Sequence, residues 1–321
     1  MWTATALWIL MCGGAAIYIA WAASLAARGV PVSLLAIGAL ALYLALILIF
    51  TAIYFSVAWI YRARRPREAQ IGVAATLSLF ANEYRALAGS ARRMMFYRLL
   101  VRDPPSPPPA ATPVLLLHGV LCNAGVWLRM SRVLAAARIA PVYTMSYGPP
   151  LASIELFADQ LAAKIDAILA ATGARSVVVV AHSMGGLVAL AYFRRFGAAK
   201  VRRLISLGSP YHGSVHARFC PGVCLAEIRP GSRWLDLLHA TPFALPLVFS
   251  IWSWHDSMVA PQTSAMLAGA ENIALTGVGH NALLADRDAA AKVVALIRQA
   301  QDEAVTSGSP ASVARTPSPP A

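Results

Sequence analysis

The chain has 321 residues, of which 58% are hydrophobic, and it carries a formal net charge of +13. A mean hydropathy of +0.61 is too high for a soluble chain of this length, so part of it must lie in lipid. The basic excess does not predict nucleic-acid binding, because the arginines nearest the apolar segments cluster within residues 61–102 and no recognisable nucleic-acid module follows. An anionic membrane face explains this cluster better.

Two long uncharged runs open the chain, at residues 2–27 and 30–61. Each exceeds the roughly 20 residues that cross a hydrocarbon core. Only Arg28 and Gly29, with Pro31 close by, separate them, which predicts two transmembrane helices joined by a tight turn within residues 1–61. A cleaved signal peptide is the alternative for the first run, but that run lacks a basic start and is long for such a signal.

The charges beside these runs predict their orientation. Four arginines stand at residues 62–67, whereas the turn between the runs holds only Arg28. By the positive-inside rule the basic end faces the cytoplasm, which places both termini and everything after residue 61 there. A periplasmic location stays open, because only one short loop opposes the basic cluster.

Residues 62–112 are predicted to form a basic juxtamembrane segment. Residues 68–101 have a helical pattern in which apolar residues recur beside arginines. This helix either lies on the membrane surface or packs against the domain that follows, and its pattern does not separate the two. Residues 103–113 are rich in proline, which predicts an extended spacer before the next domain.

The remaining chain alternates strands and helices. We expect strands at residues 114–117, 141–145, 176–181, 201–207, 247–252 and 272–275, and helices at 154–171, after Gly186, and at 286–301. This alternation predicts an α/β domain at residues 113–303 with a mostly parallel, doubly wound sheet. Residues 209–246 lose the period and form an insertion, either a cap over a site or a structured loop. Residues 304–321 are rich in serine and proline, which predicts a disordered tail.

A serine at the end of the valine-rich strand is the candidate nucleophile. It stands in Ala181-His182-Ser183-Met184-Gly185, where small residues let the neighbouring backbone approach closely. Ser183 would occupy a strained turn and present its hydroxyl at the positive end of the following helix. This arrangement resembles the nucleophile turn of the α/β-hydrolase superfamily, although Ala181 stands where the general pattern has glycine.

The resemblance implies a base and an acid in the order serine, acid, histidine. His280 is the candidate base, because it follows the last predicted strand in a glycine-rich loop that resembles the lipase pattern. Asp256 is the candidate acid, since residues 256–261 resemble the acid loop of the family. The other acidic residues between Ser183 and His280 are Glu227, Asp236 and Glu271.

An oxyanion formed by serine attack needs preorganised amide donors. The resemblance implies the amide of Met184, directly after the nucleophile, and that of Val120 in a loop like the lipase His-Gly-x motif. The residues expected to support the site are His118, Gly119, His182 and Gly185.

Further matches at residues 207–214 and 228–235 extend the resemblance to bacterial lipases and esterases over about residues 113–297. It implies a serine hydrolase that cleaves carboxylic esters without a metal or organic cofactor. Together with the two apolar runs, this predicts a two-pass protein of the bacterial inner membrane, with membrane lipids as the preferred esters. An acyltransferase or thioesterase with the same triad, and a catalytically silent membrane adaptor, are the alternatives.

The apolar residues of the insertion and its flank would form an acyl groove or belong to the core: Phe219, Trp234, Leu237, Leu238, Phe243 and Phe249. Cys220 and Cys224 are close enough in sequence to pair in an oxidising compartment.

Overall fold

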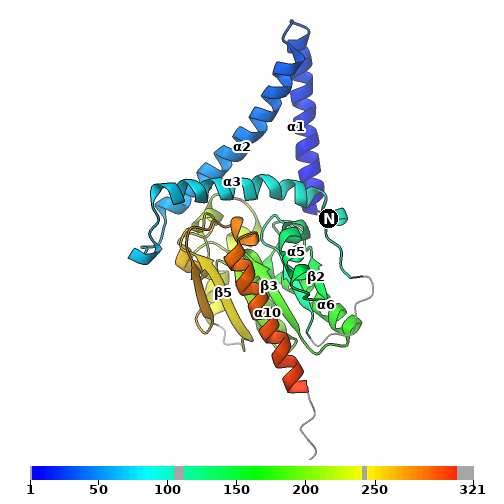
Figure 1. Ribbon diagram of the computed structural model, residues 1–321, viewed down its shortest axis with the longest axis vertical. Helices are drawn as coiled ribbons and strands as arrows, with labels where there is room; N and C mark the ends of the chain where they lie inside the picture. The colour runs from blue at the N-terminus through cyan, green and yellow to red at the C-terminus, as the bar shows by residue number, and fades with distance from the viewer. Residues whose placement is uncertain (1, 105–111, 241–243, 309–321) are drawn as a thin grey trace, which may run out of the picture.

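The computed structural model describes residues 2–104, 112–240 and 244–308. Within these ranges six strands form one sheet in the order β2-β1-β3-β4-β5-β6, and every neighbouring pair is parallel (Figure 1). The strands are β1 (Val114–Leu117), β2 (Val142–Met145), β3 (Val177–His182), β4 (Val201–Leu207), β5 (Leu247–Ser253) and β6 (Glu271–Leu275). The predicted parallel, doubly wound sheet is confirmed.

Helices cover both faces of this sheet. Leu115 and Val179 face a core shared with α6 (Ile154–Thr172) and α7 (Met184–Phe196). Their neighbours Leu116 and Val178 face a second core, shared with α5 (Leu128–Ala136) and α10 (Arg287–Gly308). Successive side chains of a strand point to opposite faces, so a strand buried on both faces needs an unbroken apolar run, and this explains the four valines of β3.

Two long apolar helices rise from the α/β domain. They are α1 (Trp2–Ala26) and α2 (Val32–Ile60), and both are long and apolar enough to cross a membrane. Most of their large apolar side chains are exposed. Figure 1 shows the two helices splayed apart, with the connecting turn far from the sheet and the N-terminal end beside the domain.

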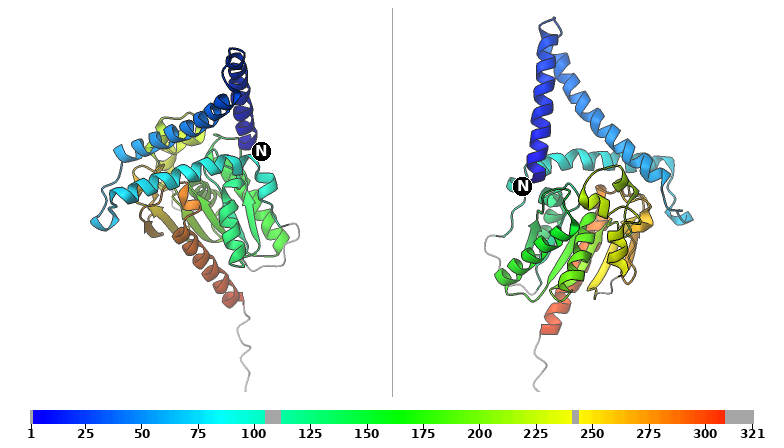
Figure 2. Two further views of the ribbon diagram at one scale, coloured as in Figure 1. Left: turned by 45° about the horizontal axis from the view of Figure 1, so that its top comes forward. Right: turned by 180° about the vertical axis from the view of Figure 1, so that it is seen from behind.

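Helix α3 (Val73–Met95) crosses the top of the α/β domain between the lower ends of α1 and α2 (Figures 1 and 2). One face, with Leu79, Glu83 and Met94, is buried, whereas Val73 and Leu77 near its start are exposed. Of the two interpretations of this segment, the structure therefore favours packing for most of the helix. Short helices flank it, η1 (Arg67–Ala69) before and α4 (Tyr97–Leu100) after.

Short elements and chain ends complete the description. The insertion between β4 and β5 contains η3 (Val215–Arg218), α8 (Val223–Glu227) and α9 (Arg233–Ala240), and the other short helices are η2 (Ala124–Trp127), η4 (Gln262–Ala265) and η5 (Ala282–Leu284). Helix α10 continues to Gly308, past residue 301, so residues 304–308 of the predicted tail are helical. Residues 309–321 of that tail, and residues 105–111 of the proline-rich spacer, lie outside the described residues.

Candidate active site

Ser183 lies at the sharp turn between β3 and α7, with φ of 55° and ψ of −129°. A positive φ is costly for any residue with a Cβ, so the surroundings must hold it in place. The Ser183 amide donates to the Leu207 carbonyl at 2.9 Å. A Cβ at Gly185 would lie 2.7 Å from the carbonyl oxygens of Leu117 and His118. Glycine at position 185 is therefore required for the β1 loop to reach the serine.

His280 and Asp256 form a buried pair beside this turn. His280 Nδ1 lies 2.9 Å from Asp256 Oδ2, and both side chains are only 2–3% exposed. The other carboxylate oxygen accepts from the amides of Met258 at 2.8 Å and Val259 at 2.7 Å. Because a carboxylate only accepts, Nδ1 must donate, which leaves Nε2 free to take a proton.

The electrostatics single out His280 among the histidines around it. Burial lowers its pKa, but the charge of Asp256, the hydrogen bond between them and the carboxylate of Glu83 outweigh burial, so the pKa is raised above its usual value. Burial dominates for its neighbours, and it lowers the pKa of each of them: His118 and His255 to about 4, His182 well below its usual value, and His216. His280 is thus the histidine best suited to hold a proton transiently.

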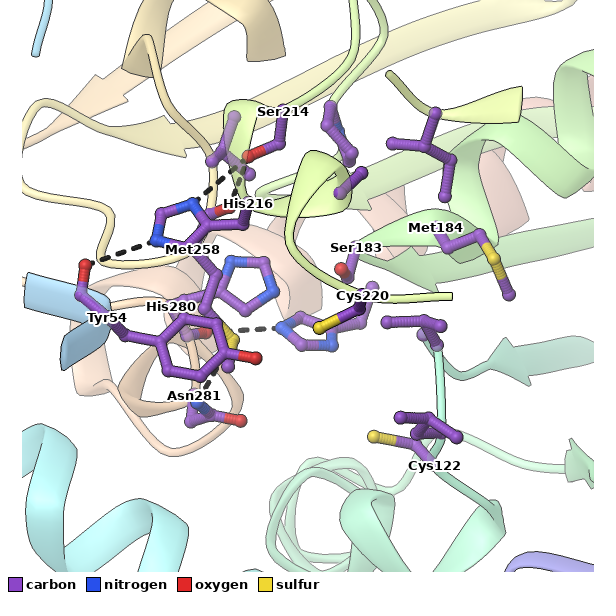
Figure 3. Close-up of a pocket in the computed structure, with 18 of the residues that line it drawn as sticks. Tyr54, Cys122, Ser183, Met184, Ser214, His216, Cys220, Met258, His280 and Asn281 are labelled. Carbon is purple, nitrogen blue, oxygen red and sulfur yellow. Dashed lines mark hydrogen bonds between the residues drawn. The ribbon is translucent and has the colours of Figure 1, made fainter. Parts of the chain in front are cut away.

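Ser183 and His280 face one cavity of about 260 Å³ (Figure 3). Met184, Gly119 and Val120 also line it. No hydrogen bond joins the Ser183 hydroxyl to the His280 ring among the bonds between described residues. Such contacts are often long without substrate and tighten when it binds.

Two backbone amides are available beside the serine. Met184 is the first residue of α7, where an amide has no intrahelical acceptor. Within the part of the chain that the structure describes, neither its amide nor that of Val120 donates to a loop or side-chain acceptor. A Cβ at Gly119 would lie 2.7 Å from the Ser183 Cβ, so the Val120 loop passes very close to the nucleophile candidate.

The histidines predicted to support the site are buried and bonded to backbone. His118 Nδ1 lies 2.8 Å from the Gly119 carbonyl, and its ring stacks on Tyr147 at 4.0 Å. His182 Nε2 lies 3.2 Å from the carbonyl of His280. A further histidine, His255, which was not among these predicted residues, accepts from the Gly277 amide at 3.1 Å and so braces the loop that carries His280.

The remaining acidic candidates lie elsewhere. Asp236 and Glu271 are exposed on the surface. Glu227 accepts from the Ser153 hydroxyl at 2.6 Å and the Ile154 amide at 2.7 Å, which caps the start of α6. Of the acidic residues between positions 183 and 280, only Asp256 pairs with His280.

Glu83 on α3 is a site residue that the sequence analysis did not single out. It is 2% exposed, and its carboxylate accepts from the Ser257 hydroxyl, the Asn281 amide and side chain, and the Ala282 amide at 2.8–2.9 Å. It therefore holds the loops of both Asp256 and His280. A signal existed, since Glu83 is an acidic residue on the same helical face as Leu79 and Leu87.

The expected acyl groove is not built from the residues named for it. Leu238 and Phe249 are buried in the core, Trp234 donates to Glu155 at 2.8 Å, and Phe219 and Leu237 are exposed. None of these five lines the cavity, and Phe243 lies outside the described residues. Phe249 belongs to strand β5, and the short helices of the insertion pack on α6 and α7. Other insertion residues, including Ser214, His216 and Cys220, reach the cavity instead.

Cys220 and Cys224 are separate thiols, the first exposed and the second buried. In the described ranges, no group of three or more His, Cys, Asp and Glu side chains is arranged to hold a metal ion.

Comparisons with known proteins agree with this architecture. A family model described as the alpha/beta hydrolase fold matches residues 112–220. The mature lipase BlEst2 of Bacillus licheniformis is 17% identical, with a TM-score of 0.52 over 63% of this chain and 95% of that one. Lipase B of Aspergillus fumigatus is 21% identical, with a TM-score of 0.53 over 62% and 56% of the two chains. Phospholipase PlaB of Legionella pneumophila is 13% identical, with a TM-score of 0.50 over 62% and 63%.

Proposed function

We propose that this chain, which has the α/β-hydrolase fold, is a serine hydrolase of carboxylic esters anchored in a membrane by α1 and α2. The observation that carries the proposal is one arrangement. Ser183, held at a strained turn, faces the same cavity as His280. The Nδ1 atom of His280 is hydrogen-bonded to the buried Asp256. This is the arrangement that nucleophilic ester cleavage requires.

The reaction would proceed in two halves. The Ser183 oxygen attacks the ester carbonyl while His280 Nε2 takes the hydroxyl proton, and Asp256 stabilises the imidazolium that results. The amides of Val120 and Met184 receive the negative charge that develops on the carbonyl oxygen. His280 then gives its proton to the departing alcohol, leaving an acyl group on Ser183. Water, deprotonated by His280, releases the acid and restores the serine.

The membrane anchor supports lipid esters as the substrate class. Residues 1–61 would form the anchor and residues 62–112 the juxtamembrane helix and spacer, which hold the hydrolase domain of residues 113–303 at the bilayer surface. Confinement to that surface raises the rate at which the site meets membrane esters. Two of the similar structures are lipases and one is a phospholipase, which is in line with such substrates.

Labelling with a fluorophosphonate probe tests the proposal. The full-length protein in detergent should be labelled and should release free acid from p-nitrophenyl esters without added alcohol or thiol, whereas Ser183→Ala should do neither. Ser250→Ala is a matched control, because this buried serine of β5 lies outside the cavity and contacts neither Asp256 nor His280 through its hydroxyl. Labelling that survives Ser183→Ala would move the nucleophile, and an unlabelled wild type would favour a silent adaptor.

A further inference from the structure

Two helices that precede the α/β domain, α2 and α3, form part of the wall of the candidate cavity. Phe50 and Tyr54 of α2 line it, as do Leu87, Ser90 and Met94 of α3. Most of these side chains are apolar, and so are Leu225, Ile228 and Val259 on the domain side. The serine therefore opens into an apolar chamber completed by the proposed anchor, and such a chamber suits a hydrocarbon chain better than a polar group.

Specific contacts fix α2 against the rim of this chamber. The Tyr54 ring stacks on His216 at 5.0 Å with an interplanar angle of 10°, and the Tyr54 carbonyl accepts from His216 Nε2 at 3.1 Å (Figure 3). Phe55 packs on Phe80 of α3 at 5.2 Å. The lower end of α2 is thus held by both the insertion and α3, so it forms part of the site.

The position of Phe50 along α2 sets the depth of the chamber mouth. A helix rises about 1.5 Å per residue, so Phe50 lies about 27 Å from Val32 at the hairpin turn. That is close to the roughly 30 Å thickness of a hydrocarbon core. With the turn at the far surface and α2 close to the membrane normal, Phe50 would lie near the opposite surface, where the ester groups of membrane lipids are found. Its side chain is 42% exposed and would contact lipid there.

We propose that the chamber takes the acyl chain of a long-chain membrane lipid, which passes directly from the bilayer between α2 and α3. The inference rests on the proposed function and adds to it the substrate class and the route of entry. An acyl chain that moves from lipid into this chamber avoids transfer through water, which is unfavourable for each methylene group.

Substitutions in the helical walls test the route through chain-length preference. We expect Leu87→Trp, which fills the chamber from α3, to lower the ratio of kcat/KM for p-nitrophenyl hexadecanoate to that for the acetate by about tenfold or more. Phe50→Ala, which removes a wall from α2, should lower the same ratio. The matched controls are Leu77→Trp on α3 and Ile53→Ala on α2, both at exposed positions outside the chamber, and they should leave the ratio unchanged.

Fluorophosphonate labelling of each variant reports whether the site is folded. If Leu87→Trp is not labelled, the test rests on the comparison of the hexadecanoate-to-acetate ratio in Phe50→Ala with that in Ile53→Ala. A ratio that stays at the wild-type value in labelled wall variants would overturn the inference while leaving the proposed function intact. An unlabelled wild-type protein would instead overturn the proposed function, and the inference with it.

A vesicle experiment tests entry from the bilayer separately. The full-length protein is reconstituted into vesicles of phosphatidylcholine and phosphatidylglycerol, with a fluorogenic long-chain phospholipid either in the same vesicles or in separate protein-free ones. We expect hydrolysis when protein and substrate share a bilayer and little when they do not. Equal rates in the two arrangements would show that substrate arrives through water and would overturn the proposed route.

Discussion

At the scale of single residues, Asp256 has both carboxylate oxygens occupied, one by His280 and the other by two backbone amides. Asp256→Asn should keep the fold but place an amide where the carboxylate accepted, so the imidazole loses its correct tautomer. We expect kcat for p-nitrophenyl esters to fall by roughly four orders of magnitude. Asp236→Asn, at an exposed position on α9, is the control and should be nearly neutral. A larger loss at Asp236 would assign the acid there.

Glu83 predicts a pH effect without touching the cavity. Its charge contributes to the raised pKa of His280, after the larger effects of burial and Asp256. Glu83→Gln removes that charge, so the pKa of His280 should fall. Since the base must be neutral to act, the acidic limb of the kcat/KM profile should move to lower pH.

A structural role alone would not move this limb. In Glu83→Gln the side-chain NH2 group would replace the oxygen that accepts from the Ala282 amide, so two donors would face each other. The His280 loop would be held less firmly, and kcat should drop as well. The matched control is Glu68→Gln, an exposed carboxylate that precedes the same helix. An unshifted limb in Glu83→Gln, with lower stability alone, would make Glu83 a packing residue.

Ser183 and His280 could be predicted from the sequence because each follows a predicted strand and has small neighbouring residues. Such neighbours are needed where the backbone turns sharply to present a catalytic side chain. Glu83 differs, because its role depends on where α3 docks. A helical pattern gives the direction of a side chain around its own axis. It does not say which loop of a distant segment that side chain will meet. Here one partner, Asn281, lies 198 positions further along the chain.

At the scale of elements, the docking of α3 depends on one close approach. A Cβ at Gly125 in η2 would lie 2.3 Å from the Arg93 carbonyl oxygen and 2.9 Å from the Tyr97 Cβ. Backbone cannot give way cheaply there, so Gly125→Ala should cost about 1–3 kcal/mol. We expect a lower Tm in thermal unfolding of the detergent-solubilised protein.

Gly89→Ala is the control for this prediction. Residue 89 lies within α3, and its added Cβ would meet only the flexible end of the Arg93 side chain. Alanine is the better helix former, so the change should be neutral or stabilising by up to about 1 kcal/mol. If Gly125→Ala unfolds at the wild-type temperature, the close approach of η2 to α3 does not require glycine at position 125.

The strands were more predictable than the insertion for a physical reason. A strand buried on both faces must be continuously apolar, so an apolar run such as residues 177–181 can be recognised in the sequence as a buried strand. The insertion instead has short helices, in which some apolar residues pack only in the core and others also line the cavity. Leu235 packs in the core while Ala217 and Leu225 also line the cavity, and no periodicity distinguishes the two uses.

At the scale of the whole molecule, the two apolar runs were evident from composition, but their part in the cavity was not. Phe50 and Tyr54 read as ordinary aromatic residues near the end of an apolar helix. Their relation to Ser183 arises only when α2 descends onto the insertion and α3 closes the gap (Figure 2). A cavity lined by both α2 and the α/β domain is a property of tertiary packing, which spacing along the chain does not encode.

The sidedness of the molecule gives the last prediction. The end of the hairpin nearest the α/β domain carries Arg62, Arg64, Arg65 and Arg67, whereas the turn at the other end carries Arg28 alone. By the positive-inside rule this asymmetry predicts that the domain lies in the cytoplasm. Alkaline phosphatase needs an oxidising compartment for its disulfides, so a fusion after residue 321 in a bacterial host should be inactive. A fusion after Gly29 should be active and serves as the control. The reverse pattern would place the hydrolase domain, and any lipid that it cleaves, at the outer leaflet.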